Sequence, residues 1–177
     1  MELVVCSDNT SVQYWSRAET GRYERRFGSA SPFDSIRVGA LVPSSTKSFW
    51  IQPLIPQPYP QVVDWNRDGR LDLLLSFTSK SCVHYFEQQA DGSLLRVLGD
   101  RSSFSGISAY CAADHVPPAG VRAVDWDDDG DLDLIVSRTV DLTDTTFMAG
   151  LEYFEHLLDG SLRQRVAGEN PFADLSV

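Results

Sequence analysis

Two short segments of the chain place acidic side chains at alternate positions, a spacing that suits a metal ion. Residues 64–72 and residues 125–133 both follow the pattern D-x-[N/D]-x-D-G-x-x-D. Oxygen atoms at positions 1, 3, 5, 7 and 9 of such a loop can surround a hard cation, which takes about six to eight oxygen ligands. The glycine at position 6 allows the sharp turn that this requires. The spacing therefore predicts one calcium ion in each loop.

Calcium fits these loops better than other common metals. Magnesium demands a compact octahedral shell and keeps several of its waters, and zinc prefers the histidine and cysteine side chains that both loops lack. Position 7 would contribute its main-chain carbonyl and the other positions their side chains. The predicted ligands are Asp64, Asn66, Asp68, Arg70 and Asp72 in the first loop, and Asp125, Asp127, Asp129, Asp131 and Asp133 in the second.

Two other interpretations of the spacing deserve comparison with this one. An EF-hand needs a glutamate at position 12 and a helix on each side, but position 12 is Leu75 in one loop and Val136 in the other. The flanking residues are strand formers, so we expect each loop to close a β-hairpin instead. An acidic Asp-Gly turn without metal stays open as the alternative, although two aligned copies weigh against it.

The loops belong to a longer repeat, and repeats determine the fold class. The segment 63–73 returns at 124–134, a shift of 61 residues, and the segment 85–94 returns at 153–162, a shift of 68 residues. An insertion of about seven residues therefore separates the two blocks in the last copy, and we expect it to form a loop within Ser137–Gly150. A third version of the second block lies near the start, with Tyr14, Gly28 and Phe33 matching Tyr85, Gly99 and Phe104, and these in turn matching Tyr153, Gly168 and Phe172.

Short runs of strand-forming residues surround each loop, and none has a helical period. The sequence predicts strands over residues 61–65, 71–77, 83–88 and 94–98, and again over 121–126, 132–138, 151–156 and 161–166. Four antiparallel strands per repeat indicate β-propeller blades, so the predicted fold is all-β, a partial or open propeller of about two and three-quarter blades. The predicted units are a partial first blade (1–39), a Pro/Ser-rich linker (40–60), a second blade (61–109), a linker (110–120) and a third blade (121–177).

The charge of the chain excludes some partners. The formal net charge is -10, whereas binding to nucleic acid requires a basic face that replaces the counterions of the phosphates. Anionic membranes are disfavoured for the same reason, and no apolar run approaches the length of a transmembrane segment. Three cysteines, Cys6, Cys82 and Cys111, leave open one disulfide with a free thiol or three thiols.

The motif Val-Asp-Trp-Asp-x-Asp-Gly-Asp-Leu-Asp-Leu around Asp125 resembles the FG-GAP or VCBS repeat family, which forms the blades of integrin α-subunit propellers and of secreted propeller proteins that include some lectins. The resemblance covers nearly the whole chain. It implies a calcium ion in each hairpin loop between the first two strands of a blade, here the loops that start at Asp64 and Asp125. Arg67 and Arg70 make the first loop less acidic, so weaker binding is expected there.

These features predict a calcium-stabilised interaction or scaffold module that binds a protein partner or a larger assembly. Calcium loops of this kind favour an extracytoplasmic compartment, where calcium is millimolar. One alternative is an accessory subunit docked on a large complex, which could be membrane-bound. Another is a glycan-binding propeller that uses exposed aromatic side chains, with Trp50 and Tyr59, which do not repeat, as better candidates than Tyr14, Trp15 and Tyr110.

An enzymatic function is disfavoured. His84, His115 and His156 have no spacing typical of a metal site or a catalytic triad, and nothing marks Cys111 as a reactive thiol. The G-x-S-x-G pattern of a nucleophile elbow is absent around Ser105. We therefore expect a protein without catalytic activity.

Overall fold

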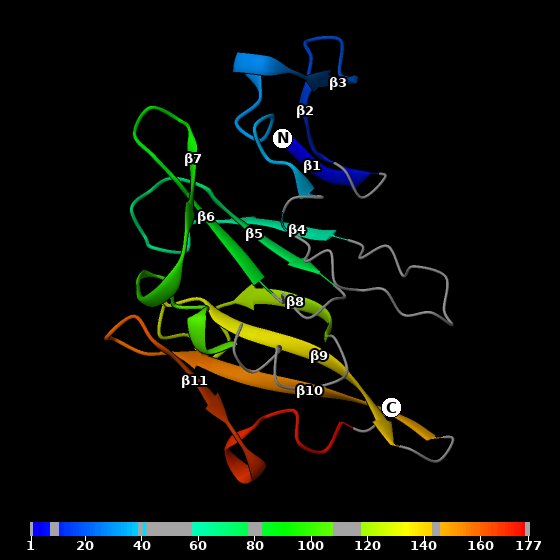
Figure 1. Ribbon diagram of the computed structural model, residues 1–177, viewed down its shortest axis with the longest axis vertical. Coiled ribbons are helices and arrows are strands. Elements are labelled where there is room, and N and C mark those ends of the chain that lie inside the picture. Colours follow the sequence, from blue (N-terminus) through cyan, green and yellow to red (C-terminus); the bar gives the residue numbers. More distant parts are fainter. Residues whose placement is uncertain are drawn as a thin grey trace.

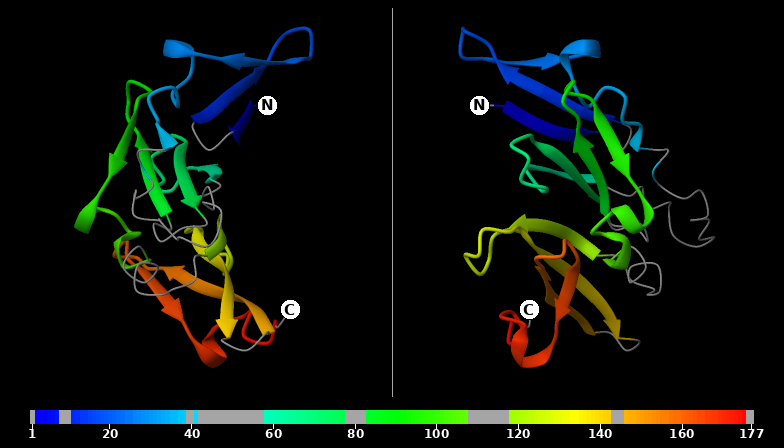
Figure 2. Two further views of the ribbon diagram at one scale, coloured as in Figure 1. Left: turned by 45° about the vertical axis from the view of Figure 1, so that its right-hand side comes forward. Right: turned by 90° about the vertical axis from the view of Figure 1, so that its left-hand side faces the viewer.

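The computed structural model describes residues 2–7, 11–38, 41, 58–77, 83–107, 118–142 and 146–175, and its regular structure there is almost entirely β (Figure 1). Three antiparallel sheets follow one another along the long axis of the molecule (Figures 1 and 2). The all-β prediction, with antiparallel sheets of up to four strands, is confirmed.

Each sheet is a meander in which successive strands pair as neighbours. The first has the order β1-β2-β3, the second β4-β5-β6-β7 and the third β8-β9-β10-β11. Their bounds are β1 Glu2–Ser7, β2 Ser11–Arg17 and β3 Tyr23–Arg26; β4 Pro58–Val63, β5 Asp72–Phe77, β6 Val83–Gln88 and β7 Leu94–Val97; and β8 Pro118–Val124, β9 Asp133–Leu142, β10 Thr146–His156 and β11 Leu162–Arg165.

The registers confirm that the repeats fold alike. Leu3 pairs with Trp15, Leu73 with Phe86 and Leu134 with Phe154, so β1, β5 and β9 occupy the same place in their sheets. Strands β4 and β8 begin at prolines that fall within the ranges predicted as linkers. Proline suits the start of an edge strand because it cannot donate to the ladder.

The insertion in the third repeat differs from the expected loop within Ser137–Gly150. Strand β9 continues to Leu142 and β10 starts at Thr146, and the two pair from Leu142 opposite Thr146 to Leu134 opposite Phe154. The added residues include β-branched and aromatic types, which favour pairing over an irregular loop. They therefore lengthen a hairpin.

Each sheet ends in a short 3-10 turn whose first residue has a left-handed backbone. These turns are η1 (Gly28–Ala30), η3 (Gly99–Arg101) and η4 (Ala167–Glu169). The angle φ is 56° at Gly28, 62° at Gly99 and 51° at Ala167. The predicted match of Gly99 with Gly168 is therefore wrong by one residue, because Ala167 takes the left-handed position in the third repeat.

Neighbouring sheets pack through continuous hydrophobic cores. One core lies between the second and third sheets and includes Trp65, Phe104 and Leu134; the other lies between the first and second sheets and includes Phe33 and Leu73. Strand β4 contacts β1 on one side and β8 on the other. The side-chain amide of Gln61 joins the second sheet to the third. Its Nε2 donates to the carbonyl of Ala123 and its Oε1 accepts from the N–H of Ala123, both at 2.8 Å.

Candidate metal sites in two acidic loops

Both acidic loops connect the first two strands of a four-stranded sheet, as the hairpin prediction requires. The first loop lies between β4 and β5, and the second between β8 and β9. Positions 4 and 6 of each loop have left-handed backbones, with φ of 57° at Arg67, 83° at Gly69, 59° at Asp128 and 89° at Gly130. Two left-handed residues per loop curl the chain inward, so that side chains at positions 1, 3 and 5 converge.

In the second loop three predicted ligands come together. Carboxylate oxygens of Asp125, Asp127 and Asp129 all lie within 4.8 Å of one another. Asp125 Oδ1 is buried and has no hydrogen-bond partner. An unpaired buried carboxylate oxygen is costly, and a cation is a group that would satisfy it. This donor set, three carboxylates around a small volume, fits a hard divalent ion.

The electrostatics of the second loop also favour a cation. Desolvation raises the pKa of Asp127, and the neighbouring carboxylates of Asp133, Asp129 and Glu155 raise it further, although a backbone hydrogen bond with Asp129 acts in the opposite direction. Repulsion among these carboxylates is the free-energy cost that a bound divalent ion would remove.

In the first loop the corresponding carboxylate oxygens accept hydrogen bonds from N–H groups of the loop itself. Asp64 accepts hydrogen bonds from the N–H groups of Asp68 (3.0 Å) and Gly69 (2.9 Å). Asp68 accepts from the N–H of Arg70 at 2.9 Å and forms an ion pair with the Arg70 guanidinium. A cation would have to displace that guanidinium from Asp68, which is a physical reason to expect weaker binding in this loop.

The aspartate at position 9 has a second role that the spacing alone does not indicate. Asp72 and Asp133 are fully buried, and each carboxylate joins its loop to the third strand of the same sheet. Asp72 Oδ2 accepts from the Trp65 N–H (3.2 Å) and the Tyr85 hydroxyl (2.8 Å), while Oδ1 accepts from the Gln88 N–H (2.8 Å).

The third sheet repeats this arrangement. Asp133 Oδ2 accepts from the Trp126 N–H (3.2 Å) and the Tyr153 hydroxyl (2.8 Å), and Oδ1 accepts from the His156 N–H (2.9 Å). Desolvation and the hydrogen bond to the aspartate raise the pKa of both tyrosine hydroxyls, which therefore stay protonated as donors. A tyrosine recurs after each acidic loop, Tyr85 in one repeat and Tyr153 in the other, and this recurrence is the sequence signal that could have indicated the contact.

The two loops are linked to each other across the sheets. Arg67 Nη2 in the first loop lies 2.7 Å from Asp131 Oδ1 in the second. The side chain of Asp131 is thereby turned to the arginine, which leaves its main-chain carbonyl as the predicted ligand.

The remaining candidate residues do not form a second site among the described residues. Tyr14 packs on Phe33 with ring centroids 5.8 Å apart, and Tyr59 and Trp15 are half-buried in strands. Burial raises the pKa of the Cys6 thiol to about 12, which disfavours a reactive thiolate. The other residues named from the sequence, Trp50, Tyr110, Cys82, Cys111 and His115, lie outside the described residues.

Comparisons with known proteins bear on the loops directly. Residues 64–136 match the family model of the FG-GAP-like repeat, a range that starts at the first ligand position of the first loop and includes the whole second loop. A search of the curated proteins finds no match, and a search of the solved structures finds none either. Within the described residues, no helix has the length and hydrophobicity needed to cross a membrane.

Proposed function

We propose that this chain, which carries an FG-GAP-like repeat over residues 64–136, is a calcium-stabilised β-propeller module that binds a protein partner or a larger assembly and has no catalytic role. The observation that carries the proposal is the second acidic loop. There, three carboxylates converge on one small volume, and a buried oxygen of Asp125 has no partner.

Calcium in this role is structural. With a dissociation constant of about 0.1 mM and about 1 mM calcium, each filled loop stabilises the folded state by roughly 1.4 kcal/mol. Concentrations of this order are extracytoplasmic, so we place the protein in a secreted, cell-surface or luminal setting. The second loop binds more tightly than the first, in which Arg70 already pairs with Asp68.

The propeller arrangement rests on how the sheets meet. Successive sheets pack face to face, with β1, β4 and β8 brought next to one another in turn. Closed propellers have about four to eight blades, so three sheets do not close a ring by themselves. The outer face of the third sheet leaves Trp126 46% and Val124 36% exposed, and an apolar surface of this kind favours a protein partner.

The test is calcium titration of the purified chain by calorimetry, with thermal melting in calcium and in chelator. We expect two sites of unequal affinity and a higher melting temperature in calcium. Asp129→Asn should abolish the tighter site and Asp68→Asn the weaker one, while Asp174→Asn, outside the loops, serves as the matched control. A chain that binds no calcium and melts at the same temperature in both buffers would disprove the calcium proposal.

A further inference from the structure

The residue at position 7 differs between the two acidic loops, and the difference places a positive charge inside the first loop. Position 7 is Arg70 in the first loop and Asp131 in the second. The Arg70 guanidinium pairs with the carboxylate of Asp68, at position 5 of the same loop. The Asp131 carboxylate instead pairs with Arg67 of the other loop. The first loop therefore contains a cation of its own, next to the place where a metal ion would bind.

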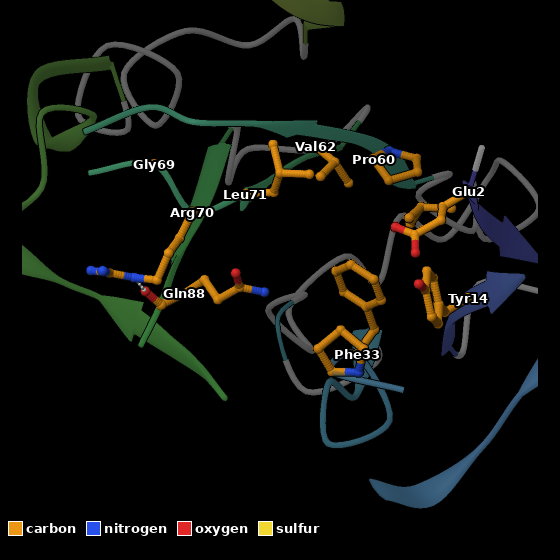
Figure 3. A pocket seen from close by; sticks show the side chains of 11 residues that line it. Glu2, Tyr14, Phe33, Pro60, Val62, Gly69, Arg70, Leu71 and Gln88 are labelled. Carbon is orange, nitrogen blue, oxygen red and sulfur yellow. Dashed lines mark hydrogen bonds between the residues drawn. The ribbon is translucent and has the colours of Figure 1, made fainter. Parts of the chain in front are cut away.

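Arg70 also ties the first loop to the third strand of its sheet. Its Nε donates to the carbonyl of Gln88, the last residue of β6, at 2.9 Å. Figure 3 shows this contact at one wall of a pocket between the first and second sheets. The planar guanidinium thus binds a loop carboxylate through Nη2 and a strand carbonyl through Nε at the same time. One side chain both neutralises Asp68 and holds the loop against the strand.

Hydrogen bonds satisfy every side-chain oxygen at positions 1, 3 and 5 of the first loop. The two oxygens of Asp64 accept from the N–H groups of Asp68 and Gly69. Asn66 Oδ1 accepts from the Asp68 N–H at 3.1 Å. Asp68 Oδ1 accepts from the Arg70 N–H, and its Oδ2 accepts from Asn66 Nδ2 and from the guanidinium. Because donors of the loop reach all of these oxygens, the loop does not need a metal ion to satisfy them.

The second loop satisfies its oxygens less completely. Asp127 accepts from the Asp129 N–H at 3.2 Å, and Asp129 accepts from the Asp131 N–H at 2.7 Å. Asp125 Oδ1, at the position of Asp64, is buried without a partner. The same chain geometry therefore leaves a need for a cation in the second loop that the first loop does not have.

The charges of the two loops differ in the same direction. Residues 64–72 contain three aspartates and two arginines, a formal charge of 2 − 3 = −1, whereas residues 125–133 contain six aspartates and no basic residue, a formal charge of −6. Repulsion among carboxylates is what a bound divalent ion removes. Much less of this repulsion is present in the first loop.

The guanidinium would also compete with a metal ion in the first loop. An ion among the oxygens of Asp64, Asn66 and Asp68 would lie beside a like charge, and the two repel. The guanidinium would have to leave Asp68, which breaks a charge-assisted hydrogen bond together with the contact to Gln88. Calcium binding therefore has a cost in this loop that comes from one side chain.

We propose that the Arg70 guanidinium is the resident cation of the first loop, the group that keeps this loop folded without calcium and sets its calcium affinity below that of the second loop. Arg70 neutralises Asp68 and joins it to Gln88, as a bound ion would neutralise the second loop. At calcium concentrations that fill the second loop, the first loop retains Arg70. The comparison of the loops in calcium rests on the proposed function, whereas the role of Arg70 in the metal-free chain does not.

The first test is made in chelator, by hydrogen exchange of the full chain and of Arg70→Gln. We expect exchange over residues 64–72 to be at least about tenfold faster in Arg70→Gln, because the loop loses its cation and its tie to Gln88. Exchange over β5 reports whether the whole sheet has opened, and it should not change. Arg101→Gln, on an exposed arginine outside both loops, is the matched control. Equal exchange over residues 64–72 in Arg70→Gln and Arg101→Gln overturns the proposal, whether or not the chain binds calcium.

The second test is calorimetric titration with calcium in an Asp129→Asn background, which isolates the first loop. Adding Arg70→Gln should raise the calcium affinity at least about tenfold at low salt, and adding Arg101→Gln should leave it unchanged. In the unaltered chain, calcium that just fills the second loop should slow exchange over residues 125–133 at least about tenfold and leave residues 64–72 unaffected.

Two results of the second test overturn the proposal: equal slowing in both loops of the unaltered chain, or no gain in affinity from Arg70→Gln. A chain in which neither loop responds to calcium contradicts the proposed function instead. The exchange measured in chelator then still decides the role of Arg70.

Discussion

The guanidinium of Arg67 in one acidic loop lies 2.7 Å from the carboxylate of Asp131 in the other, so the two candidate metal sites are coupled electrostatically across the sheet interface. A Cβ added at Gly130 would lie 3.1 Å from Arg67 Nη2, which shows how closely this side chain approaches the second loop. The first loop thus places a positive charge next to the site where the second loop would bind a cation.

Removing this charge should tighten calcium binding in the second loop. Arg67→Gln eliminates the repulsion between the guanidinium and the bound cation and frees the Asp131 carboxylate, so we expect affinity to rise about threefold to tenfold at low salt. Because Arg67 is half-exposed, the gain should shrink as salt is added. Calorimetry measures both effects, with Arg22→Gln, on an exposed arginine between β2 and β3, as the control. An unchanged affinity would mean that the charge is fully screened.

The buried hydrogen bonds of the position-9 aspartates should contribute to stability without any metal. Tyr153→Phe removes the hydroxyl that donates to Asp133 Oδ2 and leaves a buried carboxylate short of one partner, which costs about 1–3 kcal/mol. Urea unfolding in chelator measures the loss. Tyr23→Phe, on an exposed tyrosine, is the control, and equal stabilities of the two variants would contradict the role assigned to the contact.

How much could be predicted from sequence depended on whether a feature was local. The strand positions and hairpin loops followed from alternating strand formers around Asp-Gly turns, and the match of residues 64–136 with the FG-GAP-like repeat agrees with them. The double role of Asp72 and Asp133 could not be read from spacing, because a metal ligand and an acceptor for buried donors require the same residue type at the same place.

Contacts between repeats could not be predicted either, because they join residues that are far apart in the sequence. The pairing of Arg67 with Asp131 and the bridge from Gln61 to Ala123 join residues about 60 positions apart, and only the packing of the sheets brings them together. The length of the β9–β10 hairpin was also missed, since an insertion between repeats indicates extra residues without showing whether they pair.

The left-handed alanine predicts a stabilising substitution. Ala167 has φ of 51° where the other two repeats have glycine, and this conformation costs an ordinary residue about 1–2 kcal/mol. Ala167→Gly relieves that strain but adds unfolded-state entropy, so we expect a net gain of about 0.5–1 kcal/mol. The converse change, Gly99→Ala, should destabilise by a similar amount, because its Cβ would meet no atom within 4 Å and only the backbone is affected. Urea denaturation of both variants provides the test, and a loss of stability in Ala167→Gly would refute it.

His84 should make the fold sensitive to mild acid. Burial and the nearby Arg96 lower the pKa of His84 to about 4, well under its ordinary value. As the pH falls from about 6.5 towards 4, the His84 imidazole binds a proton in the unfolded chain but stays neutral in the folded chain. Stability is therefore lost in that pH range. Between pH 7 and pH 5 we expect a loss of about 2 kcal/mol from this group. His84→Gln should remove that part of the pH dependence in chelator, and an unchanged slope would exclude His84 as its source.

Two tryptophans at the same position of the repeat should differ in their contribution to stability. Trp65 is 3% exposed between two sheets, whereas Trp126 is 46% exposed and packs on Phe172 of its own repeat with ring centroids 4.5 Å apart. Trp65→Ala should therefore cost about 3–5 kcal/mol and Trp126→Ala about 1–2 kcal/mol, as measured by urea unfolding of the dilute chain. Equal losses would mean that another surface buries Trp126 in solution. Light scattering would then separate self-association from an intramolecular cover, because only association depends on protein concentration.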